Sequence, residues 1–398
     1  MPGERFFSAS DEEIRKGRTT DVYFERTMQV LKAHGLDRKE AHAEFTASSL
    51  PRSWPWGVFA GVEELARLMQ GKNVDISCLP EGTVFRSRDH TGLRVPVMTI
   101  SGAYGEYCIY ETPMLGFLCF ASGVATSAAR CHLAAQGRPV LSFGVRRMHP
   151  ALSPVIDRSA YIGGCDSASS LLGAELVGQR PTGTMPHALI LMFGDQRKAF
   201  AAFGKEIDED ARTALVDTFC DEKAETIMAL ESMPGLRAVR LDTPASRRGD
   251  ICEIVREVKW ELACRGRPEV KVLISGGLGE ADLPNLVKAG ADGFGVGTSI
   301  ANSPTIDFSL DIVEKEGRSI SKRGKLSGRK ETFRCPDCIE FKVKLAGEDR
   351  PCCPHCGAEM EPALRPLLKA GERVAPAEKE ADLRARTLAQ LEKLKVVC

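Results

Sequence analysis

Two glycine-rich turns are the segments of this sequence best suited to hold a phosphate. Ser275-Gly276-Gly277 and Gly295-Val296-Gly297-Thr298 each end a short apolar run, and they lie about 20 residues apart. Glycine lets backbone N–H groups approach an anion, and the loops after the last strands of an α/β barrel commonly bind phosphate in this way. Tight turns that only reverse the chain are the alternative. Because both turns end consecutive predicted strands, we favour the phosphate interpretation.

Charged side chains follow other predicted strands. Arg240 and Asp242 are two residues apart, so they project to the same side of a strand. Asp242 and Asp217 could bind ribose hydroxyls or a magnesium ion that carries a diphosphate, whereas an ion pair of Arg240 with Asp242 in the core is the alternative. Arg146 and Arg147 directly follow a strand and could clamp a carboxylate or diphosphate, unless they are only solvated loop residues.

One histidine lies where chemistry is expected. His187 closes the segment Gly183-Thr184-Met185-Pro186-His187, at a predicted strand end and in the first turn of a helix that continues through Phe193. A neutral imidazole there could attack a phosphoryl donor or donate a hydrogen bond to an anion, with Thr184 beside it. A lone histidine is more often structural, but the glycine and threonine around this one favour a chemical role.

Four cysteines have the spacing of a zinc ribbon. They form two Cys-x2-Cys pairs with fourteen residues between the pairs: Cys335 and Cys338, then Cys353 and Cys356. Two such knuckles supply the tetrahedral thiolate set that a structural Zn²⁺ takes. Cys352 would break the spacing, and we expect His355 to point away from the metal. Four thiolates leave no open position for a substrate, so we expect a structural or docking role.

Strands and helices must alternate to position these groups. From about residue 112, short apolar runs recur every 20 to 30 residues with helical stretches between them: 140–143, 160–162, 181–183, 214–216, 238–241, 270–274 and 293–296. This alternation predicts parallel βαβ units in an α/β fold. Seven strand candidates favour an irregular or incomplete barrel as much as a regular one of eight strands. Earlier in the chain, 95–100 and 107–110 read as strands of a smaller sheet.

These segments predict three domains. We expect an N-terminal open-faced α/β sandwich over residues 1–118, completed by about 310–330, and a catalytic α/β barrel over 119–309. The zinc ribbon and a charged C-terminal helix follow over 331–398. A chain of 398 residues is long enough for several cores.

Composition limits the partners. Acidic and basic side chains number 54 each, so no overall field draws the protein to nucleic acid or an anionic membrane. A basic run over 322–330 lacks the aromatic residues that would stack on single-stranded bases, and is either solvated or in contact with an anionic substrate. We see no signal peptide and no uncharged apolar run of about 18 residues. We therefore expect a cytoplasmic protein without membrane or nucleic-acid partners.

Several motifs in a fixed order resemble those of nicotinate phosphoribosyltransferases, particularly shorter archaeal-type members with a C-terminal zinc ribbon. The motifs that carry this resemblance are Thr20-Asp21-x-Tyr23, Glu111-Thr112-Pro113, Phe143-Gly144-x-Arg146-Arg147, Gly163-Gly164, Gly183-Thr184-Met185-x-His187, Leu215-Val216-Asp217-Thr218, Arg240-Leu241-Asp242 and the two glycine turns. They are spread over nearly the whole chain. Pro186 stands where we would expect alanine, and Ser169-Ser170 where many relatives have Ser-Asn.

The resemblance implies an activity and its site. It implies transfer of the phosphoribosyl group from phosphoribosyl pyrophosphate to nicotinate in NAD biosynthesis, with Mg²⁺ on the diphosphate and with ATP hydrolysis coupled through a phosphorylated His187. It further implies that Tyr23 from a neighbouring subunit stacks on the nicotinate ring, and that Arg146 or Arg147 pairs with the carboxylate. A homodimer or a larger homo-oligomer such as a hexamer follows.

Other functions remain open. Quinolinate phosphoribosyltransferase shares the implied fold but removes a carboxylate, and would need further basic residues. A non-catalytic protein whose ribbon recruits a partner is an alternative of another class, and an unrelated barrel enzyme acting on a sugar phosphate is a third. His187 and Asp242, together with both glycine turns, favour a working transferase.

Overall fold

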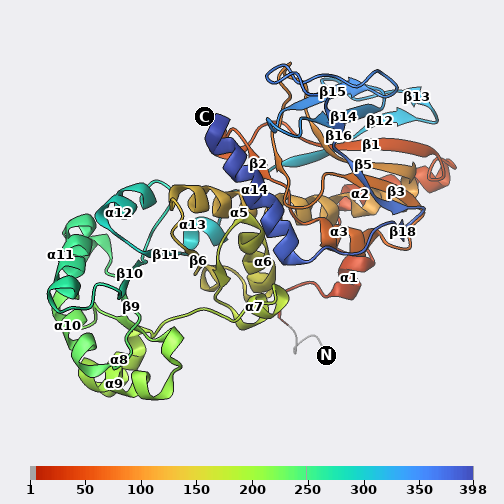
Figure 1. The fold of residues 1–398 in the computed structure, drawn as a ribbon. Helices are drawn as coiled ribbons and strands as arrows, with labels where there is room; N and C mark the ends of the chain where they lie inside the picture. Colours follow the sequence, from red (N-terminus) through yellow and green to blue (C-terminus); the bar gives the residue numbers. More distant parts are fainter. Residues whose placement is uncertain (1–5, 248, 398) are drawn as a thin grey trace. The chain divides into compact units, whose positions relative to one another are not determined.

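The computed structural model describes residues 6–247 and 249–397 (Figure 1). The chain forms two compact units. One contains the residues up to Thr126 and those from Pro304 onward, and the other is Ser127–Ser303. The first unit therefore combines N-terminal and C-terminal segments, including the four cysteines. The limits of the three predicted domains stay a prediction.

An antiparallel sheet of seven strands organises the first unit. Its order is β13 (Arg318–Ser319), β12 (Phe308–Lys315), β1 (Glu40–Ala47), β5 (Pro96–Ala103), β3 (Val74–Cys78), β17 (Arg365–Lys369) and β18 (Glu372–Arg373). Every residue of β1 after Glu40 is buried, so the centre of the sheet is covered on both faces. Figure 1 shows helices α2 (Val22–Ala33) and α3 (Val62–Met69) on one side of this sheet. The predicted N-terminal sheet is thereby confirmed.

A small ribbon sheet lies on the other side of the large sheet (Figure 1). It consists of β15 (Phe341–Leu345), β14 (Lys330–Arg334) and β16 (Glu361–Pro362). The Thr332 hydroxyl donates to the Pro96 carbonyl, which ties the two sheets together. Other elements of the unit include α1 (Asp11–Arg15), β2 (Gly57–Val58), β4 (Val84–Phe85), α4 (Tyr104–Tyr107) and α14 (Glu380–Val397).

The strand predicted over 107–110 is wrong. Tyr107 ends α4, and Cys108–Tyr110 form a 3-10 turn that leads directly into the long helix α5 (Glu111–Ala134). Both Tyr107 and Cys108 are buried. A run of four apolar residues does not by itself distinguish a strand from a buried helical turn.

One helical stretch is more apolar than the sequence analysis expected of any segment. Residues 104–134 are long and apolar enough to cross a membrane by length and composition, with a mean hydropathy of 1.3 over the most apolar window. Of that window, 67% is buried within the protein. A core helix has the same length and composition, so this property alone is weak grounds for a membrane span.

A parallel sheet of six strands organises the second unit. Its order is β7 (Ser167–Ala168), β6 (Val140–Ser142), β11 (Gly293–Val296), β10 (Lys271–Ile274), β9 (Ala238–Leu241) and β8 (Thr213–Leu215). The edges β7 and β8 are not paired with each other, so the sheet is an open, incomplete barrel, one of the two forms predicted. Its strands are almost fully buried, as expected for a parallel sheet.

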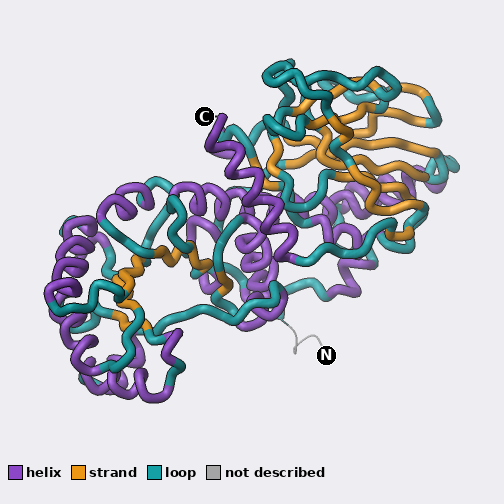
Figure 2. Tube along the Cα trace, viewed as in Figure 1, coloured by secondary structure: helices purple, strands orange, loops and turns teal. Residues whose placement is uncertain are grey.

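Helices cover the outer side of this parallel sheet. They are α6 (Ser153–Gly163), α7 (Leu171–Leu176), α8 (His187–Phe193), α9 (Gln196–Glu206), α10 (Glu222–Ser232), α11 (Ile251–Cys264), α12 (Leu283–Ala289) and α13 (Thr298–Ala301). In Figure 2 the strands β9, β10, β11 and β6 follow an arc, and helices form the outside of that arc. The carboxyl ends of the strands therefore share one edge, where the loops of a barrel build a site.

Two of the seven predicted strands are wrong. Residues 160–162 belong to α6, which has a proline in its first turn and ends at Gly163, directly before Gly164 with φ +116°. Residues 181–183 are irregular, although the Thr182 N–H donates to the Ala168 carbonyl. Pro181 has no N–H for a strand ladder, and the segment forms no strand.

Candidate active site

A cavity of about 300 Å³ opens at the carboxyl ends of the parallel strands. We call it the strand-end cavity. Its lining is drawn from the loops after β6, β7, β9, β10 and β11, together with the segment before α8: Phe143, Val145, Arg146, Arg147, Ser169, Thr182, Gly183, Thr184, Arg240, Asp242, Ser275, Gly276, Gly277, Gly295, Gly297 and Thr298. Eleven of the residues predicted from the sequence as catalytic or substrate-binding lie in this lining. The fold thus brings them together, and their individual roles stay predictions.

Both glycine turns face the strand-end cavity. Gly276 and Gly277 follow β10 with φ of +92° and +73°, a conformation that side chains other than glycine rarely adopt. A Cβ on Gly276 would also lie 2.9 Å from the Asp242 carbonyl oxygen. In the second turn, a Cβ on Gly295 would lie 2.5 Å from the ring of Phe143, so this glycine is required by packing. The first turn therefore exposes backbone, and the second allows its strand to pack closely against β6.

Three arginines make the strand-end cavity basic. Arg146 and Arg147 are exposed on the turn after β6, and among the described residues neither guanidinium has a carboxylate partner. Arg240 is more buried. Its Nη2 lies 3.9 Å from Asp242 Oδ2 and donates to the Met185 carbonyl at 3.4 Å. Burial lowers the pKa of Arg240, whereas Asp242 and Asp217 oppose that shift.

The ion pair between Arg240 and Asp242 is long, so it does not by itself account for the two charges. Asp242 instead accepts a hydrogen bond at 2.7 Å from the Ser275 hydroxyl, which joins β9 to the first glycine turn. Asp242 Oδ2 remains near Arg240 at the cavity surface. Both side chains could therefore contact a ligand in this cavity.

His187 begins α8 and faces two carboxylates. Its Nε2 lies 3.7 Å from Asp217 Oδ1 and 3.9 Å from Asp242 Oδ2, while Nδ1 is 3.1 Å from the Thr218 hydroxyl. The His187 side chain is 40% exposed, so the ring is accessible to a ligand. The predicted helix from His187 through Phe193 is confirmed, whereas no strand precedes it. His187 and Asp217 thus lie beside Asp242, next to the lining of the strand-end cavity.

Asp217 is the most buried acid of this group. Burial raises its pKa, and this effect is opposed by hydrogen bonds at 2.8 Å from the Thr243 hydroxyl and from the Asp242 N–H. The other oxygen, Oδ1, is buried and has no hydrogen-bond partner among the described residues. A carboxylate oxygen in this state is suited to accept a hydroxyl proton or to bind a cation that enters with the substrate.

Sequence reasoning missed Glu225, which holds the loop after β8. Glu225 lies on α10 and is fully buried. Its carboxylate accepts three backbone N–H groups: from Thr218 at 3.0 Å, Phe219 at 2.6 Å and Cys220 at 2.7 Å. The loop that carries Asp217 is therefore fixed by a side chain from the following helix. The only signal of this role in the sequence was the position of an acidic residue in the first turn of the helix that follows the loop.

Tyr23 belongs to the other unit, so its predicted stacking on a substrate ring stays a prediction. It lies on α2 and is 57% exposed, with its ring centroid 4.3 Å from that of Phe24. The neighbouring Asp21 is fixed by Thr112, whose hydroxyl donates to its carboxylate at 3.0 Å. This contact joins two of the motifs that carried the resemblance.

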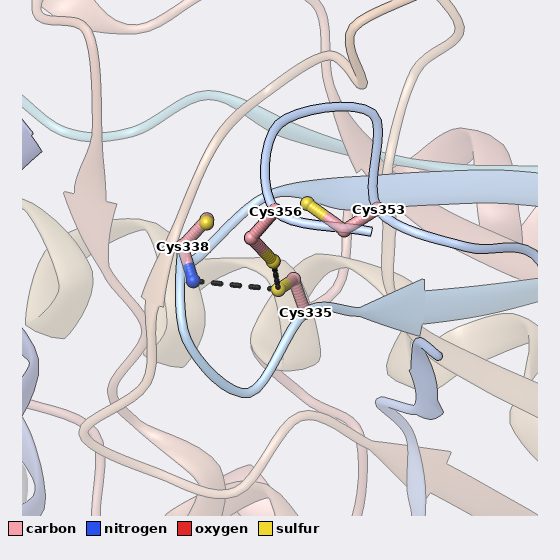
Figure 3. A group of neighbouring side chains, drawn as sticks. All are labelled: Cys335, Cys338, Cys353 and Cys356. Carbon is pink, nitrogen blue, oxygen red and sulfur yellow. Dashed lines mark hydrogen bonds between the residues drawn. The ribbon is translucent and has the colours of Figure 1, made fainter. Parts of the chain in front are cut away.

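The four predicted cysteines form one cluster, as Figure 3 shows. The sulfur atoms of Cys335, Cys338, Cys353 and Cys356 all lie within 4.8 Å of one another. A tetrahedral zinc site with Zn–S bonds of about 2.3 Å places its sulfurs about 3.8 Å apart, so a small contraction would complete it. The Cys338 N–H already donates to the Cys335 sulfur at 3.3 Å. The residues therefore fit a four-thiolate zinc site.

Neither residue beside the second knuckle joins the cluster. Cys352 is exposed and forms an isolated β-bridge with Glu359. His355 Nε2 lies 3.9 Å from a carboxylate oxygen of Glu340. Both stand outside the group of four sulfurs, as the spacing predicted.

Comparison with known proteins places the chain in a family. Residues 21–122 match the model of the quinolinate phosphoribosyl transferase N-terminal domain, and residues 124–311 match the model of the C-terminal domain. Nicotinate phosphoribosyltransferase pncB2 of Mycobacterium tuberculosis is 32% identical over 316 residues, which are 75% of this chain and 64% of that relative. The chain thus spans less than two thirds of that relative's length.

Solved structures agree with the family models. The crystal structure of nicotinate-nucleotide pyrophosphorylase from Pyrococcus furiosus has a TM-score of 0.93 and 48% identity, covering 98% of this chain and 99% of that one. Human nicotinic acid phosphoribosyltransferase has a TM-score of 0.76 at 20% identity, with 94% of each chain covered, which is a likeness of fold. This chain, with its open parallel barrel and four-cysteine cluster, belongs to the type II phosphoribosyltransferase family.

Proposed function

We propose that the protein transfers the phosphoribosyl group of phosphoribosyl pyrophosphate to nicotinate, forming nicotinate mononucleotide and pyrophosphate. The observation that carries this proposal is the strand-end cavity, which combines two glycine turns with three arginines and one aspartate in its lining. Exposed backbone N–H groups and unpaired guanidinium groups suit a substrate with a phosphate and a diphosphate. The names of the relatives described above point to the same chemistry.

The parts of the substrate can be assigned to parts of the cavity. The turn Ser275–Gly277, with Gly297 and Thr298, would hold the 5′-phosphate. Asp242 and Asp217 would bind the ribose hydroxyls or the Mg²⁺ that accompanies the diphosphate. When bound, Mg²⁺ would neutralise negative charge on the departing pyrophosphate. Because C1 gains positive charge as this group leaves, positioning and electrostatic stabilisation contribute more than a strong base.

The acceptor base is the finer part of the proposal. The single carboxylate of nicotinate would pair with Arg146 or Arg147, and Tyr23 of a second copy would stack on the ring. The second candidate acceptor is quinolinate, because both matching family models carry that name and because three arginines could serve two carboxylates. We favour nicotinate because the curated relatives are nicotinate enzymes.

One assay separates these acceptors. The protein is incubated with phosphoribosyl pyrophosphate, Mg²⁺ and either nicotinate, nicotinamide or quinolinate, and the nucleotide formed is measured by chromatography. We expect turnover with nicotinate and little with nicotinamide, which lacks the carboxylate. Turnover of quinolinate alone, with release of carbon dioxide, would refute nicotinate as the acceptor. Absence of turnover with all three would refute the transferase proposal itself.

We also propose that ATP hydrolysis is coupled to the transfer through His187. Support comes from the accessible ring beside Thr218 and two carboxylates. A phosphoryl group on Nε2 would lie next to Asp217 and Asp242, so a magnesium ion between them would be required to offset the repulsion. The test uses ATP labelled at the γ-phosphate. Acid-labile label that is absent in His187→Ala supports the coupling, and absence of label in the unmodified protein refutes it.

Three further assignments belong to the same proposal. The cysteine cluster would bind a structural zinc ion, which metal analysis of the purified protein would detect at one per chain.

The protein would be cytoplasmic and would form a homodimer or larger homo-oligomer. Exposed Val22, Tyr23 and Val30 on α2 support self-association, because large apolar side chains are commonly covered in an assembly. Light scattering of the full chain tests the oligomeric state.

A further inference from the structure

A second polar cavity lies within the unit that holds both chain ends, between the seven-stranded sheet and the ribbon sheet. We call it the sheet cavity. Its volume is about 220 Å³, and its lining comes from β1, β12, β14, β15 and two loops: Glu44, Thr46, Arg88, Gly92, Leu93, Arg94, Asp311, Val313, Gly324, Lys325, Leu326, Lys330 and Val343. None of these residues takes part in the strand-end cavity.

The floor of the sheet cavity is built from buried ion pairs. Lys330 Nζ lies 2.9 Å from Glu44 Oε2, and the two side chains are only 8% and 4% exposed. Lys325 Nζ lies 2.5 Å from Asp311 Oδ2 and also contacts the hydroxyl groups of Ser309 and Thr46. Buried ion pairs seldom stabilise a protein more than apolar residues of similar size. A charged floor beside a cavity is therefore better explained by a polar ligand than by stability.

The wall of the sheet cavity carries two arginines without acidic partners. Arg88 and Arg94 form an isolated antiparallel bridge, so their side chains start close together on one hairpin. Arg88 donates to the Gly92 carbonyl at 2.7 Å, and among the described residues neither arginine pairs with a carboxylate. Two like charges in this arrangement repel each other, and an anion between them would remove that repulsion.

Asp89, the acid next to Arg88 in the chain, has other partners: Lys342 Nζ lies 3.7 Å from its Oδ2, and its two oxygens also hold the hairpin. Its Oδ1 accepts the N–H groups of Thr91 at 2.9 Å and Leu93 at 3.0 Å, and its Oδ2 accepts the Val343 N–H at 3.0 Å. The buried Asp89 therefore fixes the hairpin against the ribbon sheet. Arg88 and Arg94 are presented by a rigid turn, which lowers the ordering cost of binding.

The charges of the lining define the sign of the ligand. Four lining side chains are cationic and two are anionic, so the net charge is +2. The two lysines are already paired with the two acids, which leaves both arginines for a ligand. His42, on the same face of β1 as Glu44, adds no charge near neutral pH, because burial and the nearby Arg329 and Lys330 lower its pKa to about 4.

We propose that the sheet cavity binds a small phosphate dianion, either inorganic phosphate or the phosphate group of a small monoester, between Arg88 and Arg94. A dianion would balance the net charge of the lining, and arginine recognises phosphate oxygens with paired N–H groups. The apolar side chains Leu93 and Leu326 would border the carbon part of a monoester. This site does not depend on the proposed transferase activity.

The test combines location with affinity. Crystals of the full chain are soaked with inorganic phosphate or, separately, with glycerol phosphate, and tungstate is used to locate the anion by its anomalous signal. We expect an anion in contact with both arginines. In solution, calorimetry of the double variant Arg88→Gln/Arg94→Gln should show phosphate binding at this site that is at least tenfold weaker than in the unmodified protein. Arg318→Gln, an exposed arginine outside the lining, should bind as the unmodified protein does.

Comparison of inorganic phosphate with glycerol phosphate also shows which of the two ligands the site prefers. Tighter binding of glycerol phosphate than of inorganic phosphate identifies a monoester site, and equal affinities identify a phosphate site. Arg147→Gln, which alters the strand-end cavity, should leave the sheet-cavity class intact. If the double variant does not fold, the single variant Arg94→Gln and the soaked unmodified crystals decide. No anion in the sheet cavity at saturating phosphate would overturn the proposal.

Discussion

The strand-end cavity and the sheet cavity are both basic, but they are built differently. The first presents backbone from glycine turns and three arginines on loops at the ends of parallel strands. The second presents side chains from the face of an antiparallel sheet, and half of its cations are already paired with buried acids. A site at strand ends can change its loops without disturbing the sheet, whereas a site on a sheet face is part of the core. Mutations should therefore affect function at the first cavity and stability at the second.

The largest expected effect is on stability, in the sheet cavity. Lys330→Met removes the partner of Glu44 and leaves an acid buried without compensation, so the free energy of unfolding should fall by about 3–5 kcal/mol. Urea unfolding measures this loss. Burial raises the pKa of Glu44 while Lys330 lowers it, so removing Lys330 raises that pKa further. The penalty should therefore shrink as pH falls and Glu44 becomes protonated.

A matched pair of variants controls this prediction. Glu44→Gln/Lys330→Met removes both charges and should recover most of the lost stability. Lys315→Met, at the exposed end of β12, should have little effect. If Lys330→Met were no less stable than Lys315→Met, the paired floor of the sheet cavity would not be a buried ion pair in solution.

The next effect is on catalysis, in the strand-end cavity. Asp242→Asn keeps the shape of the side chain but removes the charge that would hold the ribose or its magnesium ion. We expect kcat/KM for phosphoribosyl pyrophosphate to fall by about 100- to 1,000-fold, with a thermal midpoint close to that of the unmodified protein. Asp210→Asn, an exposed acid in the same unit, serves as the control. A large loss of stability with unchanged turnover would reverse the contrast between the cavities.

A smaller effect is expected behind the strand-end cavity, at Glu225. In Glu225→Gln, an amide N–H₂ would face a backbone N–H of the loop after β8, which costs about 1–3 kcal/mol. The amides of Thr218, Phe219 and Cys220 should exchange faster with solvent, and kcat should fall because this loop carries Asp217. Glu231→Gln, on the exposed side of the same helix, should change neither. Unchanged exchange at these three amides would contradict the role of Glu225 as a positioning residue.

The smallest expected effect is a gain in stability, at Asp217. Because burial raises the pKa of Asp217 in the folded protein, ionised Asp217 destabilises the fold above that pKa, and the cost disappears as pH falls towards the unfolded value. Asp217→Asn should therefore stabilise the protein at pH 7 by roughly 1 kcal/mol, with a smaller gain in acid, while reducing turnover. Thermal unfolding at several pH values checks this. A loss of stability at pH 7 would show that the hydrogen bonds from Asp242 and Thr243 outweigh the burial of the charge.

Strand prediction succeeded for five of the seven runs of the repeating series and failed for 160–162 and 181–183. The runs at 238–241, 270–274 and 293–296 are each followed by a helix and a polar turn, and all three contain strands. Residues 160–162 are equally apolar but form the last part of α6, because burial against a sheet favours the same residues in either conformation. Local composition could not separate these cases.

The sequence by itself determined the features that depend on neighbouring residues. The spacing of Cys335, Cys338, Cys353 and Cys356 specifies a four-sulfur cluster, because each knuckle is a local turn. The first glycine turn likewise follows its strand directly, since the positive φ of Gly276 and Gly277 is a property of single residues. Alternating strands and helices then require the functional loops to meet at one edge of a parallel sheet.

Only the tertiary structure decided which distant charges meet. Lys330 and Glu44 are 286 residues apart, and nothing around either position indicates the other. In the same way, Glu225 reaches the loop after β8 only because α10 packs against it, and His187 faces Asp217 and Asp242 across two separate strand ends. The energy of a charge depends on its burial and its partners, which the chain acquires on folding. The sheet cavity could therefore not be seen before the fold was known.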